Sequence, residues 1–146
     1  MPSLVIHTNS DIDYLATLLR HKKLPISVAW ETGRARSIEQ NRLQRQWCRE
    51  VAEQLGDHTA EEVRGISKLM FGVPIMREAS DIFREAYDRA VKPLPYEAKV
   101  AIMMEPLDMP VTRLMKVSQK REYLDAMHRH WSSMGVRLTA PERAAA

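Results

Sequence analysis

The chain has 146 residues, of which 45% are hydrophobic and 28% charged, and its formal net charge is +3. This length and composition are typical of one globular domain and exclude a disordered, collagen-like or coiled-coil protein. The single cysteine, Cys48, excludes an intramolecular disulfide and a cysteine-rich zinc site. No apolar run reaches the roughly 18 residues of a membrane span, and the first six residues lack the features of a signal peptide. We therefore expect a cytoplasmic protein.

The first thirty residues predict a β-α-β unit. Residues 3–8 are short and β-branched enough for a strand, and residues 12–23 carry apolar side chains at helical spacing before a basic last turn. Residues 25–31 place an apolar side chain at every second position, Trp30 among them, which is the pattern of a half-buried strand. A strand, a helix and a strand over this length predict a right-handed crossover.

The remainder of the chain predicts mostly helix. Capping-box patterns at residues 37–40 and 59–62 open two helices, of which the first ends at Gly56 and the second is broken at residues 72–74. Further helices are expected over 81–90, 96–104 and 118–134, with Gly135 as the last C-terminal cap and residues 110–115 as a strand or an extended arm. The expected fold class is α+β: one domain over residues 1–138, with the small β-α-β unit packed against a helical majority, and a frayed tail over 139–146.

Positive charge is concentrated at the two ends of the sequence. Residues 1–49 and residues 109–146 each carry a net charge of +4, whereas residues 50–108 carry −5. This distribution predicts a positive face that an anionic polymer could use. Solvated helices whose charges are segregated would give the same distribution.

The helix predicted after residue 36 has a basic side, the arginine ridge, which consists of Arg42, Arg45 and Arg49. At 100° per residue these three lie within about 60° of one another, opposite the apolar side of the helix. Two more arginines precede the ridge, Arg34 and Arg36. Guanidinium groups bind phosphate with two hydrogen bonds, so a row of them can follow a nucleic-acid backbone. A solvated face with ion pairs such as Arg49–Glu53 is the alternative interpretation.

A second basic cluster lies at the start of the last predicted helix and consists of Arg113, Lys116, Lys120 and Arg121. Positive charge in a first helical turn opposes the helix dipole, and a residue type placed against its local preference can mark function. The alternative is that these long side chains simply extend over a helix end.

The sequence shows no recognisable catalytic pattern. His128 and His130 are two residues apart on a predicted helix, so they do not face one ligand. No carboxylate cluster at metal-ligand spacing accompanies them, as a magnesium-dependent nuclease would need. No glycine-rich phosphate loop and no Ser-His-Asp pattern is present. Cys48 is expected to be a small buried hydrophobe. We expect a non-enzymatic protein without a metal or cofactor.

Residues 36–42, Arg-Ser-Ile-Glu-Gln-Asn-Arg, resemble a stretch of the NinB (Orf) recombination proteins of lambda-like phages, which follows an N-terminal β-α-β unit. The likeness extends loosely over most of the chain, including residues 111–115, the last helix and residues 135–138, but it is weak over 56–110. The resemblance implies a homodimeric recombination mediator of a phage or prophage. Such a protein binds single-stranded DNA and interacts with single-strand-binding protein to help load a recombinase. Gln40 and Asn41 match the motif, and a structural role at the helix start is open for both.

We assign phosphate binding to eight residues: Arg34, Arg36, Arg42, Arg45, Arg49, Lys116, Lys120 and Arg121. The apolar content of residues 103–115 and 123–134 adds to the expectation of a homodimer. The alternative function is a protein-interaction module without DNA contact, which recruits a replication or recombination factor through a methionine-rich surface around residues 103–115. Trp30 would stack on bases if it faces outward, and it is a core residue otherwise.

Overall fold

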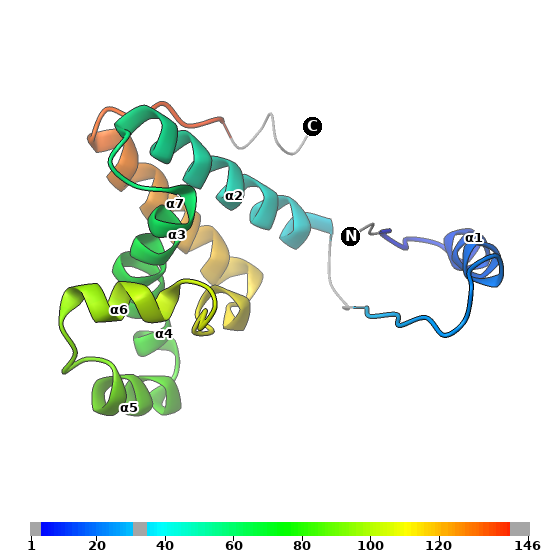
Figure 1. Cartoon of the computed structure of the whole chain (residues 1–146), viewed down its shortest axis with the longest axis horizontal. Coiled ribbons are helices and arrows are strands. Elements are labelled where there is room, and N and C mark those ends of the chain that lie inside the picture. The colour runs from blue at the N-terminus through cyan, green and yellow to red at the C-terminus, as the bar shows by residue number, and fades with distance from the viewer. Residues whose placement is uncertain (1–3, 31–34, 141–146) are drawn as a thin grey trace. The chain divides into compact units, whose positions relative to one another are not determined.

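The computed structural model describes residues 4–30 and 35–140. The chain divides into two compact units, residues 1–35 and residues 36–146, and each is described by itself (Figure 1). All regular elements in the described ranges are helical, and no strand is formed there. The α+β fold class predicted from the sequence is therefore wrong, and the described structure is all-α. None of the helices in these ranges is long and apolar enough to cross a bilayer.

The first unit contains one helix, α1, over Asn9–Arg20. The Thr8 hydroxyl accepts a hydrogen bond from the Asp11 N–H at 3.3 Å, and the Asp11 carboxylate accepts one from the Thr8 N–H at 3.2 Å. This reciprocal cap sets the start of the helix. Residues 4–7 and 26–30 have no regular secondary structure. The two predicted strands are absent because no backbone hydrogen bonds join these two segments into a ladder.

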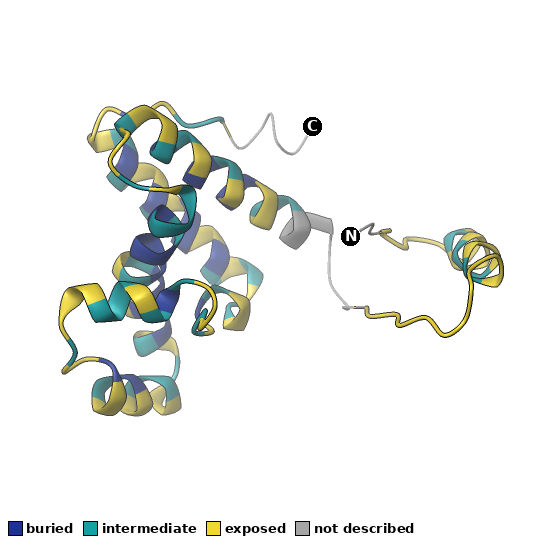
Figure 2. Ribbon diagram, viewed as in Figure 1, coloured by how far each residue is buried: buried dark blue, intermediate teal, exposed yellow. Residues whose placement is uncertain are grey.

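No residue between 4 and 30 is buried, and Figure 2 shows this segment only in the colours of exposed and half-buried residues. The apolar residues of α1 recur at helical spacing, but nothing in this unit covers them. The apolar side chains of the second predicted strand, Ile26, Val28 and Trp30, were expected to face the core and are exposed as well. The sequence pattern of a β-α-β unit is therefore present, but the helix and the two predicted strands do not bury their apolar side chains against one another.

The second unit begins with α2 (Ala35–Leu55), and Gly56 follows it with a φ of +74°. The predicted end is confirmed, because glycine adopts the left-handed conformation of a C-terminal cap at little cost. The predicted capping box at residues 37–40 is wrong, since the helix has already begun at Ala35 and Ser37 lies inside it.

α3 (Ala60–Ser67) is opened by Thr59, whose hydroxyl accepts from the Glu62 N–H at 3.1 Å while the Glu62 carboxylate accepts from the Thr59 N–H at 3.1 Å. This confirms the predicted capping box. The predicted break at residues 72–74 is wrong. A π-helical turn, η1 (Lys68–Gly72), leads directly into α4 (Val73–Ala79). Pro74 lies at the start of α4, directly after the π-helical turn.

Three more α-helices and one 3-10 turn complete the described chain: α5 (Asp81–Ala90), α6 (Tyr96–Met103), η2 (Thr112–Leu114) and α7 (Val117–Ser133). The Ser80 hydroxyl caps α5 by accepting from the Phe83 N–H at 3.2 Å. Gly135, with a φ of +88°, follows α7 as predicted. The segment predicted as a strand or extended arm forms η2 instead. Of the predicted tail, residues 141–146 lie outside the described range.

Two clusters of buried side chains form the core of the second unit (Figure 2). The first joins α2, α3 and α7 around Trp47, Val51, Val63, Tyr123 and Met127. The second joins α4, α5 and α6 to the segment before α7, and its members are Val73, Met76, Tyr87, Val91, Met103 and Val111. The apolar residues of 103–115 and 123–134 thus contribute mainly to these clusters. Leu107, Leu114 and Met134 of the same two segments remain exposed.

Gly65 lies in α3 where the helix approaches α6. A Cβ atom at this position would lie 2.6 Å from Met104 Cγ and 3.3 Å from the Val100 carbonyl oxygen. We expect Gly65→Ala to destabilise the protein by about 1–3 kcal/mol, because overpacking outweighs the roughly 1 kcal/mol gained in helix propensity. Urea denaturation followed by circular dichroism measures this difference. A variant as stable as the wild type would show that α6 moves away without cost.

Candidate nucleic-acid interface

The starts of α2 and α7 lie against each other, although they are almost eighty residues apart in the sequence. The Gln40 side-chain amide donates to the Val117 carbonyl oxygen at 3.5 Å, and the Lys120 ammonium donates to the Asn41 side-chain oxygen. Gln40 and Asn41 therefore connect α2 to the start of α7. Their contacts bring together the two basic segments that the sequence singled out.

The arginine ridge lies on the solvent side of α2. Arg42, Arg45 and Arg49 are all exposed, and the opposite side of the helix buries Leu43, Trp47 and Val51. No ion pair involves a ridge arginine within the described part of the chain. The ridge therefore presents its full positive charge to solvent, and the predicted Arg49–Glu53 ion pair is not formed.

The carboxylate nearest the ridge in sequence is engaged elsewhere. Glu50 accepts hydrogen bonds from the Thr139 N–H at 3.0 Å and from the Thr139 hydroxyl at 2.6 Å. The Trp47 indole N–H donates to the Thr139 carbonyl oxygen at 2.8 Å. The segment that follows α7 is thus held on the flank of α2 by Glu50, which directs this negative charge away from the arginines.

Lys120 does not have the place that the sequence analysis gave it. The side chain is buried, and burial, followed by the positive charge of the nearby Arg45, holds the pKa of its ammonium group below the ordinary value. Its hydrogen bond to Asn41 compensates for part of the lost hydration. Lys120 is therefore a positioning residue that joins α7 to α2, and it is not an exposed phosphate ligand.

The other predicted phosphate ligands divide into two groups. Lys116 and Arg121 are exposed at the start of α7, where the Lys116 N–H donates to the Gln119 side chain at 2.9 Å. Arg34 lies outside the described residues. Arg36 belongs to α2, but its side chain also lies outside them. Of the predicted phosphate ligands, those shown to be exposed are therefore the ridge on α2, Lys116 at the N-cap of α7 and Arg121 on α7.

A second charged cluster, which the sequence analysis missed, ties the turn after α6 to α3. Lys68 is only 2% exposed, and its ammonium donates to Asp108 at 2.7 Å and to the Met103 carbonyl oxygen at 2.8 Å. Arg64 also donates to Asp108, at 2.9 Å, and binds Glu61 through two hydrogen bonds of 2.7 and 2.9 Å. We call these four residues, Glu61, Arg64, Lys68 and Asp108, the buried charge network, after Lys68, which is buried while the other three are partly exposed.

The electrostatics of the buried charge network are those of a structural cluster. The hydrogen bond from Lys68 lowers the pKa of the Asp108 carboxyl, and that from Arg64 lowers the pKa of Glu61. Each carboxylate is already paired with a cation, so neither is available as a general base. Asp108 has a φ of +45°, an unusual conformation for a residue other than glycine, and its ion pairs hold the turn there.

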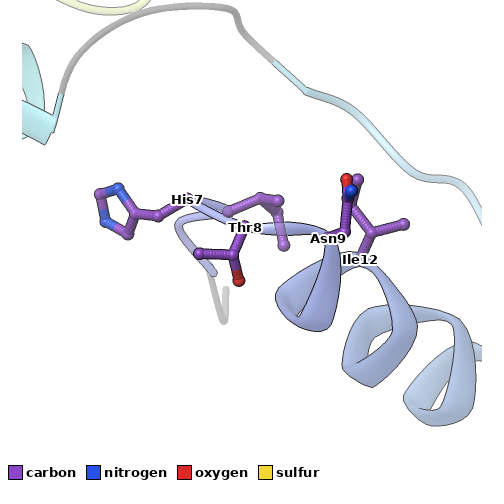
Figure 3. A pocket seen from close by; sticks show the side chains of 5 residues that line it. His7, Thr8, Asn9 and Ile12 are labelled. Atoms are coloured by element: carbon purple, nitrogen blue, oxygen red, sulfur yellow. The ribbon is translucent and has the colours of Figure 1, made fainter.

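Other candidate sites bring no reactive groups together. Burial raises the pKa of the Cys48 thiol to about 12, so it stays protonated. Among the described residues, no three His, Cys, Asp or Glu side chains are grouped as metal ligands. A recess at the start of α1 is lined by Ile6, His7, Thr8, Asn9 and Ile12. Figure 3 shows the His7 ring pointing away from Asn9 and Ile12, so the recess assembles no catalytic pair.

Comparison of the whole chain with protein-family models, with curated proteins and with solved structures gave no significant match.

Proposed function

We propose that the protein binds single-stranded DNA through the arginine ridge of α2, extended by Lys116 and Arg121 at the start of α7. The observation that carries the proposal is the row of three exposed arginines without ion-pair partners in the described structure. A protein that only needed a solvated helix face would gain more from alternating charges, which form pairs at i,i+4 spacing. Phosphate contacts of this kind carry no base information, so strong sequence preference is not expected.

The biological setting of the proposal rests on the resemblance of residues 36–42 to the NinB proteins. We propose a non-enzymatic recombination mediator of a phage or prophage, which acts in the host cytoplasm with single-strand-binding protein to help load a recombinase. The proposal includes a homodimer. Because most apolar residues of 103–115 and 123–134 contribute to the core, the dimer now rests chiefly on the resemblance.

A salt titration of binding to a fluorescently labelled oligo(dT) strand tests the proposal. Each phosphate neutralised on a single strand contributes about −0.7 to the slope of log affinity against log salt concentration. With five exposed cations in the interface, we expect a slope of roughly −3 to −4. An affinity that barely changes between 50 and 200 mM salt would contradict the proposal, as would the absence of binding at low salt.

A protein-interaction module remains the second candidate, because residues 4–30 expose an apolar face that nothing in their own unit covers. The methionine-rich surface that first suggested this function is largely absent, since Met103 is fully buried and Met109 and Met115 pack against the core. The two functions differ in their salt response. Apolar docking of a protein partner is only weakly salt-dependent, whereas phosphate binding is strongly so.

A further inference from the structure

We infer that Trp30 is a base-stacking residue, which binds an unstacked nucleobase of single-stranded DNA. This inference rests on the proposed function and deepens it, because it adds recognition of bases to binding of phosphates. It begins from the exposure of the three tryptophans. Trp47 and Trp131 are 1% and 4% exposed, whereas Trp30 is 83% exposed. An indole ring is among the largest apolar surfaces in proteins, and leaving one in water is costly unless a ligand covers it.

The surroundings of Trp30 indicate the chemistry of the ligand. From Tyr14 to Trp30 the chain contains no acidic residue, and its cations Arg20, Lys22 and Lys23 are all exposed. Asp13 and Glu31 flank this segment, which itself carries only positive charge. A segment that combines exposed aromatic rings with positive charge is complementary to single-stranded nucleic acid, which offers both a π-face and a phosphate at each nucleotide. A purely apolar protein partner would have no use for these charges.

The position of Trp30 in the chain supports the same ligand. Trp30 precedes Arg36 by six positions in the sequence. Ile26 and Val28 precede Trp30 at alternate positions and are exposed too. On a sheet such an alternation would face the core. Here the side chains are free to contact the faces of bases, which are flat and partly apolar.

Two oligomers separate base stacking from phosphate binding: oligo(dT), and an abasic deoxyribose-phosphate strand of equal length. We expect Trp30→Ala to weaken binding to oligo(dT) by about 5- to 140-fold, the range that corresponds to 1–3 kcal/mol of base–aromatic stacking. Binding to the abasic strand, and the salt slope on either strand, should not change. Trp30→Phe should keep most of the affinity, because phenylalanine also stacks. The matched control is Leu24→Ala, since Leu24 is 74% exposed in the same segment but has no ring.

Intrinsic fluorescence gives a second and independent readout, because Trp30 is the one solvent-exposed tryptophan among the three. Oligo(dT) should quench the emission of the wild type and leave that of Trp30→Phe nearly unchanged, whereas the abasic strand should quench neither. If the wild type binds neither strand, the proposed function itself fails. If it binds both equally and Trp30→Ala has no effect, only the stacking role is refuted.

Three further outcomes would also overturn the stacking role. One is an equal loss of affinity in Leu24→Ala, which would show a general apolar contact. Another is a blue shift of Trp30 emission with phosphatidylserine vesicles but not with oligo(dT), which would assign this face to a membrane surface. The third is a blue shift that depends on protein concentration without any DNA, which would show that a second copy of the chain covers the ring.

Discussion

Replacing Arg42, Arg45 and Arg49 together with glutamine is expected to reduce the slope of log affinity for oligo(dT) against log salt by about 2, since each lost phosphate contact removes about 0.7. Between 50 and 200 mM salt the wild-type affinity should therefore fall about 18-fold more than that of the variant. The melting temperature should hardly change, because the three side chains are exposed, lack ion pairs in the described structure, and are replaced by a residue of similar helix propensity.

A matched control removes the same charge elsewhere. Arg84, Arg89 and Lys92 lie on α5 or directly after it, and their replacement with glutamine lowers the net charge by the same three units. We expect this control to bind oligo(dT) with nearly the wild-type salt slope. Unchanged DNA affinity of the ridge variant together with a lower melting temperature would show that the ridge is structural. Equal effects of both triple variants would show that only net charge matters.

Replacement of Asp108 with alanine is expected to have the largest effect on stability. Among the described residues, it would leave the buried ammonium of Lys68 with the Met103 carbonyl oxygen as its remaining hydrogen-bond acceptor. Removing one partner of a buried ion pair costs about 3–5 kcal/mol. Because Asp108 is partly exposed, we expect a loss of stability at the lower end of this range, about 3 kcal/mol. Urea denaturation measured by tyrosine and tryptophan fluorescence provides the value.

Two comparisons separate this effect from the loss of any ion pair. The double variant Asp108→Ala with Lys68→Met should recover most of the lost stability, because no buried charge remains. Asp88→Ala removes a carboxylate that binds Arg77 through two hydrogen bonds, but that pair is about one-third exposed, so a loss of about 0.2–1 kcal/mol is expected. A loss for Asp108→Ala no greater than that for Asp88→Ala would contradict a buried network.

Several helix boundaries set by local chemistry were predictable from the sequence, whereas the capping-box pattern at residues 37–40 did not mark a helix start. Thr59 with Glu62, Ser80, Gly56 and Gly135 act on backbone groups within a few residues, so their patterns determine where helices begin and end. The predicted strands failed because alternation specifies which side chains share a face, while a strand also needs a neighbour for its backbone groups. No such neighbour is present for residues 26–30 in the described structure.

Only part of the candidate interface could be predicted from the sequence. The arginine ridge follows from helical spacing alone. The burial of Lys120 could also have been deduced, because at 100° per residue it lies on the same side of α7 as Tyr123, Leu124, Met127 and Trp131. The pairing of Lys68 with Asp108 could not, because the two residues are forty positions apart and the turn that joins them depends on tertiary contacts.

The π-helical turn between α3 and α4 allows one continuous rod to serve two cores. A π turn holds one more residue than an α-helical turn, so the side chains after it are set back by about 100° around the axis relative to a regular α-helix. Val63 and Ile66, before η1, belong to the first core cluster, whereas Val73 and Met76, after it, belong to the second. The turn is therefore a phase shift in the hydrophobic repeat. In a regular helix with the same residues, Val73 and Met76 would face away from the second core cluster. One continuous helix could then not contribute to both clusters.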